Sequence, residues 1–254
     1  MRIRILGCSG GIGPGLRTTS LLIDGRMLID AGTGVGDLDF GELAAIRDVV
    51  LTHSHLDHVC GLAFMADNLF GRTDQSLRVH ATTATLDTLR EHLFNWKLWP
   101  DFTTLPNAEH PLLIFSILEP GTSVGIDSAR ITPFHVLHTV PTVGYVIEAG
   151  GGVFAFSGDT WADERIWKFL NALPRLDHLM IEIAFPNRDA DLGRAARHFT
   201  PALLGSELAK LRHRPRLHLT HHKPGSEADI VDECQVALAG WDYRHLRNGD
   251  VFEC

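Results

Sequence analysis

Cysteine is scarce in this chain of 254 residues, and Cys8, Cys60, Cys234 and Cys254 are too widely spaced to form a Cys-x-x-Cys pair. This spacing excludes a disulfide framework and favours a reduced, cytoplasmic protein. Long apolar runs are also absent, since no window approaches the roughly 18 uncharged apolar residues of a membrane span. Residues 1–11 carry an apolar run too short and too interrupted for a signal peptide, and we interpret it as a first strand.

Basic residues are outnumbered, with 23 Lys and Arg against 31 Asp and Glu and a formal net charge of -8. This balance argues against nucleic acid as a partner, because a large sequence-independent footprint needs a basic face. The proportions of 44% hydrophobic and 21% charged residues are those of an ordinary globular protein. No internal repeat, low-complexity tract or linker divides the chain, so we expect residues 1–254 to form a single domain.

Short β-type runs, rich in Ile, Val, Leu or Phe, recur between turn residues. They cover residues 2–7, 19–24, 26–32, 48–54, 77–81, 129–137, 144–150, 152–158, 178–185 and 216–222. Helical periodicity covers residues 58–70, 82–96, 162–173, 200–212 and 227–240. Thr200 is a predicted N-cap, with Pro201 at the first helical position. Because strands cluster first and helices come between and after them, we predict two sheets with helices packed outside, not an alternating βαβ array.

Histidine, by contrast, is abundant, with fifteen in the chain. The densest group follows the predicted strand at 48–52 and comprises His53, His55, Asp57 and His58. His53 and His55 lie two apart on extended backbone, so both side chains face one side and can hold one ion. A polar loop with solvated histidines is the alternative, but three His and one Asp within six residues argue against it. The pattern therefore predicts a metal site.

The stretch HSHLDH resembles the HxHxDH signature of the metallo-β-lactamase superfamily, and further motifs follow in that family's order. The resemblance implies an α/β (α+β) fold, a four-layer αββα sandwich of two mixed sheets with helices on the outer faces. It also implies a binuclear centre. The assigned ligands are His53, His55 and His138 for one metal, Asp57, His58 and His221 for the other, and Asp159 as the bridge. Asp30 matches the family's early acidic residue, which lies behind the ligands and is not one of them.

Two of these assignments have alternatives. His135 and His138 lie three apart, so on a strand they point to opposite faces, and His138 at the strand's end is the favoured ligand. His135 is then a hydrogen-bonded core histidine or a neighbour of the site. His221 shares a strand face with Leu219, whereas His222 faces the other way and is interpreted as structural.

The predicted cofactors are two divalent ions, with zinc favoured and Mn or Fe as alternatives, because imidazole and carboxylate suit such ions. With Asp57, Asp159 and a bridging hydroxide, two dications leave about +1 at the site, which attracts a phosphodiester even in an acidic protein. Metals lower the pKa of bound water toward about 7 and polarise the phosphoryl group. The chemistry therefore predicts hydrolysis of a small-molecule phosphodiester.

Within the superfamily the chain resembles the class II cyclic-nucleotide phosphodiesterases. The motifs that carry this resemblance are GCSGGIG at 7–13, HLDHVCGL at 55–62, FNWKLWPDF at 94–102, IEIAFPN at 181–187 and HFTPALLGSELAKL at 198–211. Ala184 and the pair Ala66-Asp67 depart from residues common in that family. The resemblance implies hydrolysis of cAMP or cGMP to the 5′-nucleotide by a metal-bridged hydroxide. Asp57 and His198 are the predicted catalytic residues, with His198 as the general acid or, alternatively, a helix-terminal residue bonded to backbone.

Five further residues have two interpretations each or rest on the motif alone. Lys223 neutralises a phosphate oxygen or faces solvent, and Asn187, at the end of IEIAFPN, is a predicted substrate contact. Trp99 and Phe102 form a pocket wall for a nucleobase or pack in a core. Glu182 orients a ligand histidine or is a buried, paired strand carboxylate.

Two other functions compete with cyclic-nucleotide hydrolysis. An RNase Z-like tRNA 3′-end endonuclease shares similar segments, but the charge of -8 and the missing basic arm argue against it. A metal-bearing binding or scaffold protein without turnover has less need of so complete a ligand set. The expected partner is a small phosphodiester, with no membrane, and a homodimer is left open.

Overall fold

Two seven-stranded sheets pack face to face in the computed structural model, which describes every residue from 1 to 254. The first sheet has the spatial order β14 (Val251–Glu253), β1 (Arg2–Gly7), β2 (Ser20–Ile23), β3 (Met27–Ile29), β4 (Asp48–Val50), β5 (Leu77–Ala81) and β6 (Leu113–Ile117). The second has the order β13 (Tyr243–His245), β12 (Arg216–Thr220), β11 (His178–Glu182), β10 (Gly152–Phe156), β9 (Val143–Ala149), β8 (Ala129–His135) and β7 (Val124–Ile126). Both sheets are mixed: β3 to β6 and β10 to β13 pair in parallel, and the other neighbours pair antiparallel.

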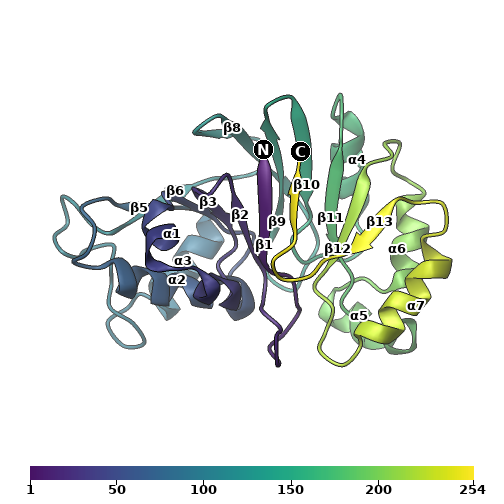
Figure 1. The fold of residues 1–254 in the computed structure, drawn as a ribbon, viewed down its shortest axis with the longest axis horizontal. Coiled ribbons are helices and arrows are strands. Elements are labelled where there is room, and N and C mark those ends of the chain that lie inside the picture. The colour runs from purple at the N-terminus through teal and green to yellow at the C-terminus, as the bar shows by residue number, and fades with distance from the viewer.

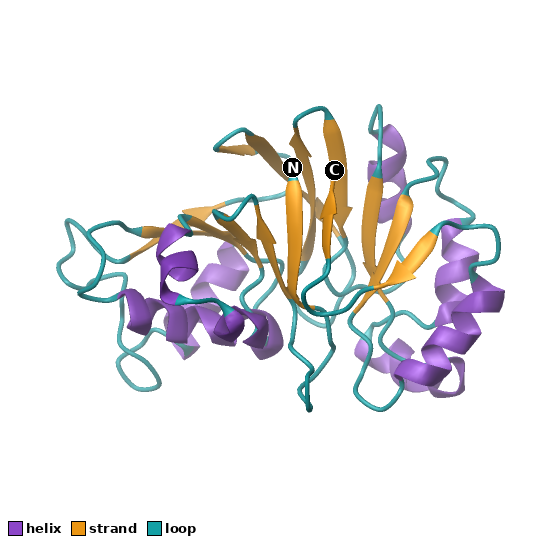
Figure 2. Cartoon of the chain, in the orientation of Figure 1, coloured by secondary structure: helices purple, strands orange, loops and turns teal.

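Helices cover the outer faces of the two sheets (Figure 1, Figure 2). Beside the first sheet lie η1 (Thr33–Asp37), α1 (Phe40–Ala45), α2 (Leu56–Leu69) and α3 (Thr83–His92). Beside the second lie α4 (Glu164–Ala172), η2 (Asn187–Asp189), α5 (Ala190–Ala196), α6 (Pro201–Leu208) and α7 (Glu227–Ala237). The predicted αββα arrangement is therefore confirmed. No helix has the length and apolar character needed to cross a membrane.

Three apolar layers follow from the alternation of side chains along the strands. In β10, Phe154 and Phe156 point into the layer between the sheets, where they join Ile3 and Ile5 of β1. The intervening Ala155 points outward and packs under the helices of the second sheet. Because central strands such as β2, β3, β9 and β10 carry apolar residues on both faces, the middle of each sheet is buried on both sides, and the layer between the sheets holds them together.

The two ends of the chain lie side by side (Figure 1). The C-terminal strand β14 leaves the second half of the chain and pairs with β1, with Arg2 opposite Glu253. The terminal amino group of Met1 donates to the Cys254 carbonyl at 3.0 Å. This closure adds a strand that our sequence interpretation did not include.

Two predicted helix details differ in the structure. The helix expected over 82–96 ends at His92, and Trp96 has φ 63°, a left-handed conformation that cannot continue a right-handed helix. Thr200 is the N-cap residue of α6, as predicted, but its side chain makes no capping hydrogen bond. Asn187 takes that role, because its Oδ1 accepts from the Ala202 N–H at 2.9 Å.

Candidate metal centre

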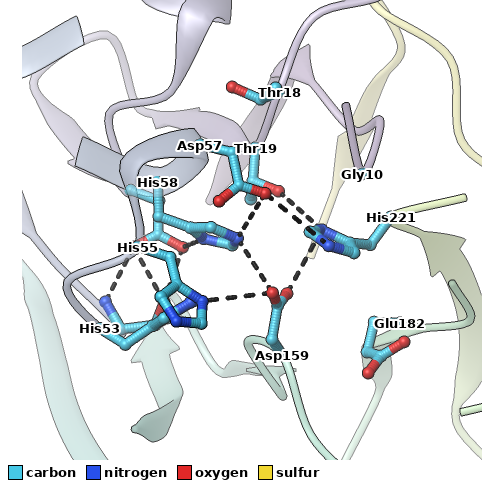
Figure 3. Close-up of polar contacts among 12 residues, drawn as sticks. Gly10, Thr18, Thr19, His53, His55, Asp57, His58, Asp159, Glu182 and His221 are labelled. Carbon is cyan, nitrogen blue, oxygen red and sulfur yellow. Dashed lines mark hydrogen bonds and ion pairs between the residues drawn. The ribbon is translucent and has the colours of Figure 1, made fainter. Parts of the chain in front are cut away.

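The candidate site lies where strands of both sheets end. After β4 the chain places His53, His55, Asp57 and His58 in a loop and the first turn of α2. Three loops of the second half approach the same place, one after β8, one after β10 and one after β12. Residues far apart in sequence therefore meet beyond the ends of these strands, and Figure 3 shows their side chains together.

The side chains form two groups of four, and the donor atoms of each group all lie within 4.8 Å of one another. The groups are His53, His55, His138 and Asp159, and Asp57, His58, Asp159 and His221. Seven residues predicted from the sequence are thus brought together, with Asp159 in both groups. Each group offers the nitrogen and oxygen donors that divalent transition ions accept.

Asp159 is the centre of the cluster (Figure 3). Its Oδ2 lies 3.7 Å from His53 Nε2 and 3.3 Å from His58 Nε2, and its Oδ1 lies 3.3 Å from His221 Nδ1. Burial by itself would raise the pKa of this carboxyl, but the neighbouring His221 and His58 hold it well below its usual value. Asp159 therefore presents a buried negative charge to both groups.

Several buried nitrogens of the cluster have no partner within the protein. The Nε2 atoms of His53, His58 and His221 are buried and make no hydrogen bond. The His55 Nδ1 and His138 Nε2 atoms face each other at 3.2 Å. Unpaired buried polar atoms are costly and rare, so their convergence fits a site built for cations. Burial lowers the pKa of His53 and His221, which keeps these rings in the neutral form that metal binding needs.

Hydrogen bonds behind the first sheet's donors orient the rings of His53 and His58. The buried Asp30 carboxylate accepts from His58 Nδ1 at 2.7 Å and from the Thr52 N–H at 2.8 Å. The Thr52 hydroxyl donates to Asp30 and lies 2.9 Å from His53 Nδ1. Because each Nδ1 is engaged on the outer side, the opposite Nε2 lone pair points into the cluster. Asp30 therefore lies behind the donors.

The second sheet supports its histidines differently. His138 Nδ1 lies 3.2 Å from the Arg197 carbonyl, which leaves Nε2 toward the cluster. His221 has φ 67°, an uncommon left-handed conformation for a non-glycine residue, and its Nδ1 lies 3.4 Å from the Thr19 hydroxyl. Gly10 permits this turn, because a Cβ on it would lie 2.5 Å from the His221 carbonyl oxygen.

The structure distinguishes the two histidines in each pair of alternative ligands, His135 or His138 and His221 or His222. His135 is exposed at the end of β8, so the interpretation of it as a core histidine is wrong, whereas His138 is buried in the cluster. His222 points away from the cluster: its Nδ1 lies 2.7 Å from the Ile183 carbonyl and its Nε2 lies 2.9 Å from His245 Nδ1. The favoured residue of each pair is the one that reaches the other donors.

His198 stands at the edge of the cluster. Its ring centroid lies 4.9 Å from that of His138 and 5.2 Å from that of His221. Its Nδ1 lies 2.9 Å from Glu182 Oε1, which also accepts from the Thr160 N–H. Burial opposes the charged ring, but the Glu182 carboxylate raises the pKa of His198 above its usual value. Glu182 therefore positions His198. It does not orient a donor histidine, which was one of its two interpretations from the sequence.

Of the four predicted substrate contacts, only Lys223 lies beside the cluster with no role in the core or at a helix end. Lys223 is half-buried, and its Nζ donates to the Gly10 carbonyl at 2.7 Å beside His221. Asn187 caps α6, and Trp99 Nε1 donates to the Ala63 carbonyl, so both side chains are already engaged. Phe102 is 2% exposed in the core under the first sheet, where no ligand can reach its ring.

Three supporting residues have no role assigned from the sequence: Thr52, Thr19 and Arg197. Thr52 directly precedes the histidine motif, so its place beside the ligands was open to inference. Arg197 precedes His198, but its left-handed φ of 57° and its carbonyl contact to His138 carry no signal in the sequence. Thr19 lies 202 residues from His221 in the chain, and only the fold brings them together.

Comparison with known proteins agrees with this fold. Residues 25–222 match the Beta-lactamase superfamily domain, so the chain belongs to this family of hydrolases. The metallo-β-lactamase fold is further shown by the protein YhfI from Bacillus subtilis, with a TM-score of 0.79 at 19% identity and coverage of 99% of both chains.

Two relatives of this chain have names that indicate particular kinds of phosphodiesterase. A probable 3′,5′-cyclic-nucleotide phosphodiesterase of Yersinia pestis is 28% identical over 249 residues, covering 81% of this chain and 71% of its own length. A ribonuclease Z of Methanopyrus kandleri is 30% identical over 156 residues, covering 58% of this chain and 50% of its own length. The resemblance to cyclic-nucleotide phosphodiesterases is thereby confirmed, and it extends further along the chain than that to ribonuclease Z.

Proposed function

We propose that this protein is a metal-dependent phosphodiesterase that hydrolyses 3′,5′-cyclic nucleotides, cAMP or cGMP, to 5′-nucleotides. The observation that carries the proposal is the pair of four-residue donor groups that share the buried Asp159. The relative of Yersinia pestis with the name of such an enzyme supports it over most of the chain. A small phosphodiester is then the principal partner, and the homodimer stays a prediction.

The cofactors in this proposal are two divalent ions, with zinc favoured by the histidine-rich donor set. His53, His55, His138 and Asp159 would hold one, and Asp57, His58, Asp159 and His221 the other. Ions bound there would supply positive charge that acidifies a water molecule and polarises a phosphoryl oxygen. The aligned Nδ1 contacts of His53, His58 and His138 keep their other ring nitrogens available for this purpose.

The remaining steps belong to the chain's own side chains. Opening the cyclic phosphate leaves an alkoxide at the 3′ oxygen, which needs a proton. His198 is placed to supply it from Nε2, because Glu182 occupies Nδ1 and stabilises the protonated ring. Lys223, between Gly10 and His221, adds a positive charge beside the phosphate position. Asp57 lies 3.9 Å from both His58 Nε2 and His221 Nε2, and its side chain is more exposed than that of Asp159, so it is the donor carboxylate that solvent reaches more easily.

The decisive test is turnover of cAMP and cGMP by protein purified with zinc or manganese, followed by chromatography of the 5′-nucleotide. Asp57→Ala should abolish turnover while the protein stays folded, because one donor of the second group is lost. Asp67→Ala is the matched control, since Asp67 lies exposed on the same helix α2. Undiminished turnover in Asp57→Ala would contradict the two-ion proposal.

A ribonuclease Z activity is the second candidate, favoured by the relative of that name. Cleavage of precursor tRNA at its 3′ end, with binding that weakens steeply as salt increases, would support it over cyclic-nucleotide hydrolysis. Binding of zinc without turnover of any phosphodiester would favour a metal-bearing binding protein. We also propose a cytoplasmic location, because all four cysteines are unpaired.

A further inference from the structure

We propose that the substrate's aromatic group, the nucleobase in a nucleotide, binds in an apolar pocket between η1 and α2 that begins one helical turn from Asp57. The inference rests on the proposed phosphodiesterase function and adds the part of the molecule that would select the ester. The pocket is a cavity of about 260 Å³, open to solvent and mostly apolar in its lining. Sites of this character, concave and apolar with few polar groups, are typical of small-ligand binding.

One wall of the pocket is a stripe of helix α2. Cys60, Gly61, Phe64 and Asn68 line the cavity, and they follow Asp57 at spacings of three, four, seven and eleven residues. Residues at these spacings share one face of a helix. At 1.5 Å per residue, the lining begins roughly 5 Å from Asp57 along the helix and extends to about 16 Å. A group joined through a ribose to a phosphate at the cluster would fall in this range.

The opposite wall is η1, which also starts at the cluster. Thr33 lines the pocket, and its hydroxyl accepts from the Thr18 N–H at 2.8 Å. Thr18 and Thr19 lie above the cluster next to Asp57 (Figure 3), and Thr19 lies 3.4 Å from His221 Nδ1. Both walls are therefore anchored at the donor groups, so the pocket opens beside the position of the phosphate.

The lining suits a flat aromatic ring with a polar edge. Val35 and Met65 are buried at the base of the pocket, whereas Phe64 is 60% exposed at its rim. An aromatic side chain left this exposed gains contact area when a nucleobase stacks on it. Asn68, at the far end, offers both an amide donor and a carbonyl acceptor to the edge of a base.

Gly36 provides a way to fill the pocket without disturbing the core. It lines the cavity, and a Cβ added to it would meet no atom within 4 Å. Gly125, in β7 at the outer edge of the second sheet, is equally open and lines no part of this pocket. Neither glycine has a left-handed φ, so Gly36→Leu and Gly125→Leu form a matched pair.

The test compares 5′-AMP, which carries a base, with ribose 5-phosphate, which does not. Calorimetry on the zinc-loaded protein should show 5′-AMP binding at least tenfold more tightly. Gly36→Leu should remove most of this preference and leave ribose 5-phosphate unchanged, and Gly125→Leu should change neither. Equal affinities in the unsubstituted protein, or an equal loss for both ligands in Gly36→Leu, would overturn the pocket.

Cys60 gives a second measurement that needs no variant. It is partly exposed in the pocket lining, and Cys254, partly exposed at the C-terminus, serves as an internal reference. Maleimide labelling followed by mass spectrometry should show 5′-AMP slowing modification of Cys60 severalfold and leaving Cys254 unaffected. Equal labelling of Cys60 with 5′-AMP and with ribose 5-phosphate would contradict the assignment.

Hydrolysis of bis-p-nitrophenyl phosphate separates failure of the pocket from failure of the proposed function. Turnover of this ester without any preference for 5′-AMP would retain the phosphodiesterase and reject the pocket. A preference for 5′-AMP with protection of Cys60, but no turnover of any phosphodiester, would retain the pocket and reject the phosphodiesterase.

Discussion

The two halves of the molecule supply the candidate metal centre in different ways. The first half contributes His53, His55, Asp57 and His58 from six consecutive positions after one strand. The second half contributes three donors from three separate loops, spread over residues 138–221. The first set can take nearly its final geometry from local backbone alone. The second set exists only when the strands of the second sheet lie in register against the first sheet, so it links the site to the fold.

The supporting contacts repeat this contrast. In the first half, Asp30 and Thr52 form a compact network behind His53 and His58. In the second half, His138 depends on the carbonyl of Arg197, a residue 59 positions away. We therefore expect a substitution of the shared Asp159 in the second half to weaken binding of zinc at both donor groups. A substitution behind the donors of the first half should reduce zinc affinity by a smaller factor.

Asp159→Ala should have the largest effect, because both donor groups lose a member. We expect the loss of zinc affinity and of turnover to exceed the roughly 10–100-fold that removal of an outer partner costs. Zinc content by mass spectrometry and turnover of cAMP measure it. Asp191→Ala, a fully exposed aspartate in α5, is the control and should change neither. Retention of two zinc ions by Asp159→Ala would break the comparison.

His198→Ala should have the next largest effect, and only on catalysis. Loss of a general acid should slow cAMP hydrolysis by about 10²–10⁴-fold. Bis-p-nitrophenyl phosphate should be less affected, because its phenolate leaves without a proton. Glu182→Gln should give the same pattern more weakly, since Glu182 holds His198 through Nδ1. Equal losses on both esters would reject the assignment of a proton donor.

Asp30→Asn tests the first half with a smaller effect. The amide can still accept from the Thr52 N–H, but it no longer presents a charge to His58 Nδ1. We expect zinc affinity to fall by about 10–100-fold, measured by competition with a chelating dye. Asp48→Asn is a matched control, because Asp48 pairs with His80 at 2.8 Å outside the site. An unchanged affinity in Asp30→Asn would show that His58 needs no such partner.

His222→Ala should have the smallest effect on the site and a measurable one on stability. Its partners, the Ile183 carbonyl and His245, would be left unpaired in a buried place, at a cost of about 1–3 kcal/mol in the free energy of unfolding. Exposed His135→Ala should stay within about 0.5 kcal/mol. Denaturant unfolding measures both, and zinc content should not change in either. Loss of zinc in His222→Ala would reverse the assignment of His221.

The sequence was sufficient for the layers of the fold and for the seven residues of the cluster. The order of strand and helix segments indicated two sheets with helices outside them, and the resemblance carried by HSHLDH implied the four-layer fold. Strand alternation favoured His138 over His135 and His221 over His222. In the structure β8 ends at His135 and β12 at Thr220, so the preferred residues lie in the loops that follow the strands. The structure places both preferred residues in the cluster.

The sequence could not predict features that depend on contacts between segments far apart in the chain. Glu182 reads as a strand carboxylate in the sequence, and only packing shows that its partner is His198. Phe102 stood in an aromatic segment that suited a ligand pocket, yet it is buried in the core. Strand β14 pairs with β1 across the whole length of the chain, and no local pattern identifies such a partner. Side-chain identity thus predicted which residues gather in the cluster better than it predicted the partner of each one.

Anomalous diffraction at the zinc edge, from crystals of zinc-loaded protein, tests the two-group centre most directly. We predict two peaks roughly 3.5–4 Å apart, one among His53, His55 and His138 and one among Asp57, His58 and His221, with Asp159 between them. A single peak, or peaks that leave Asp159 without contact to either ion, would contradict the account.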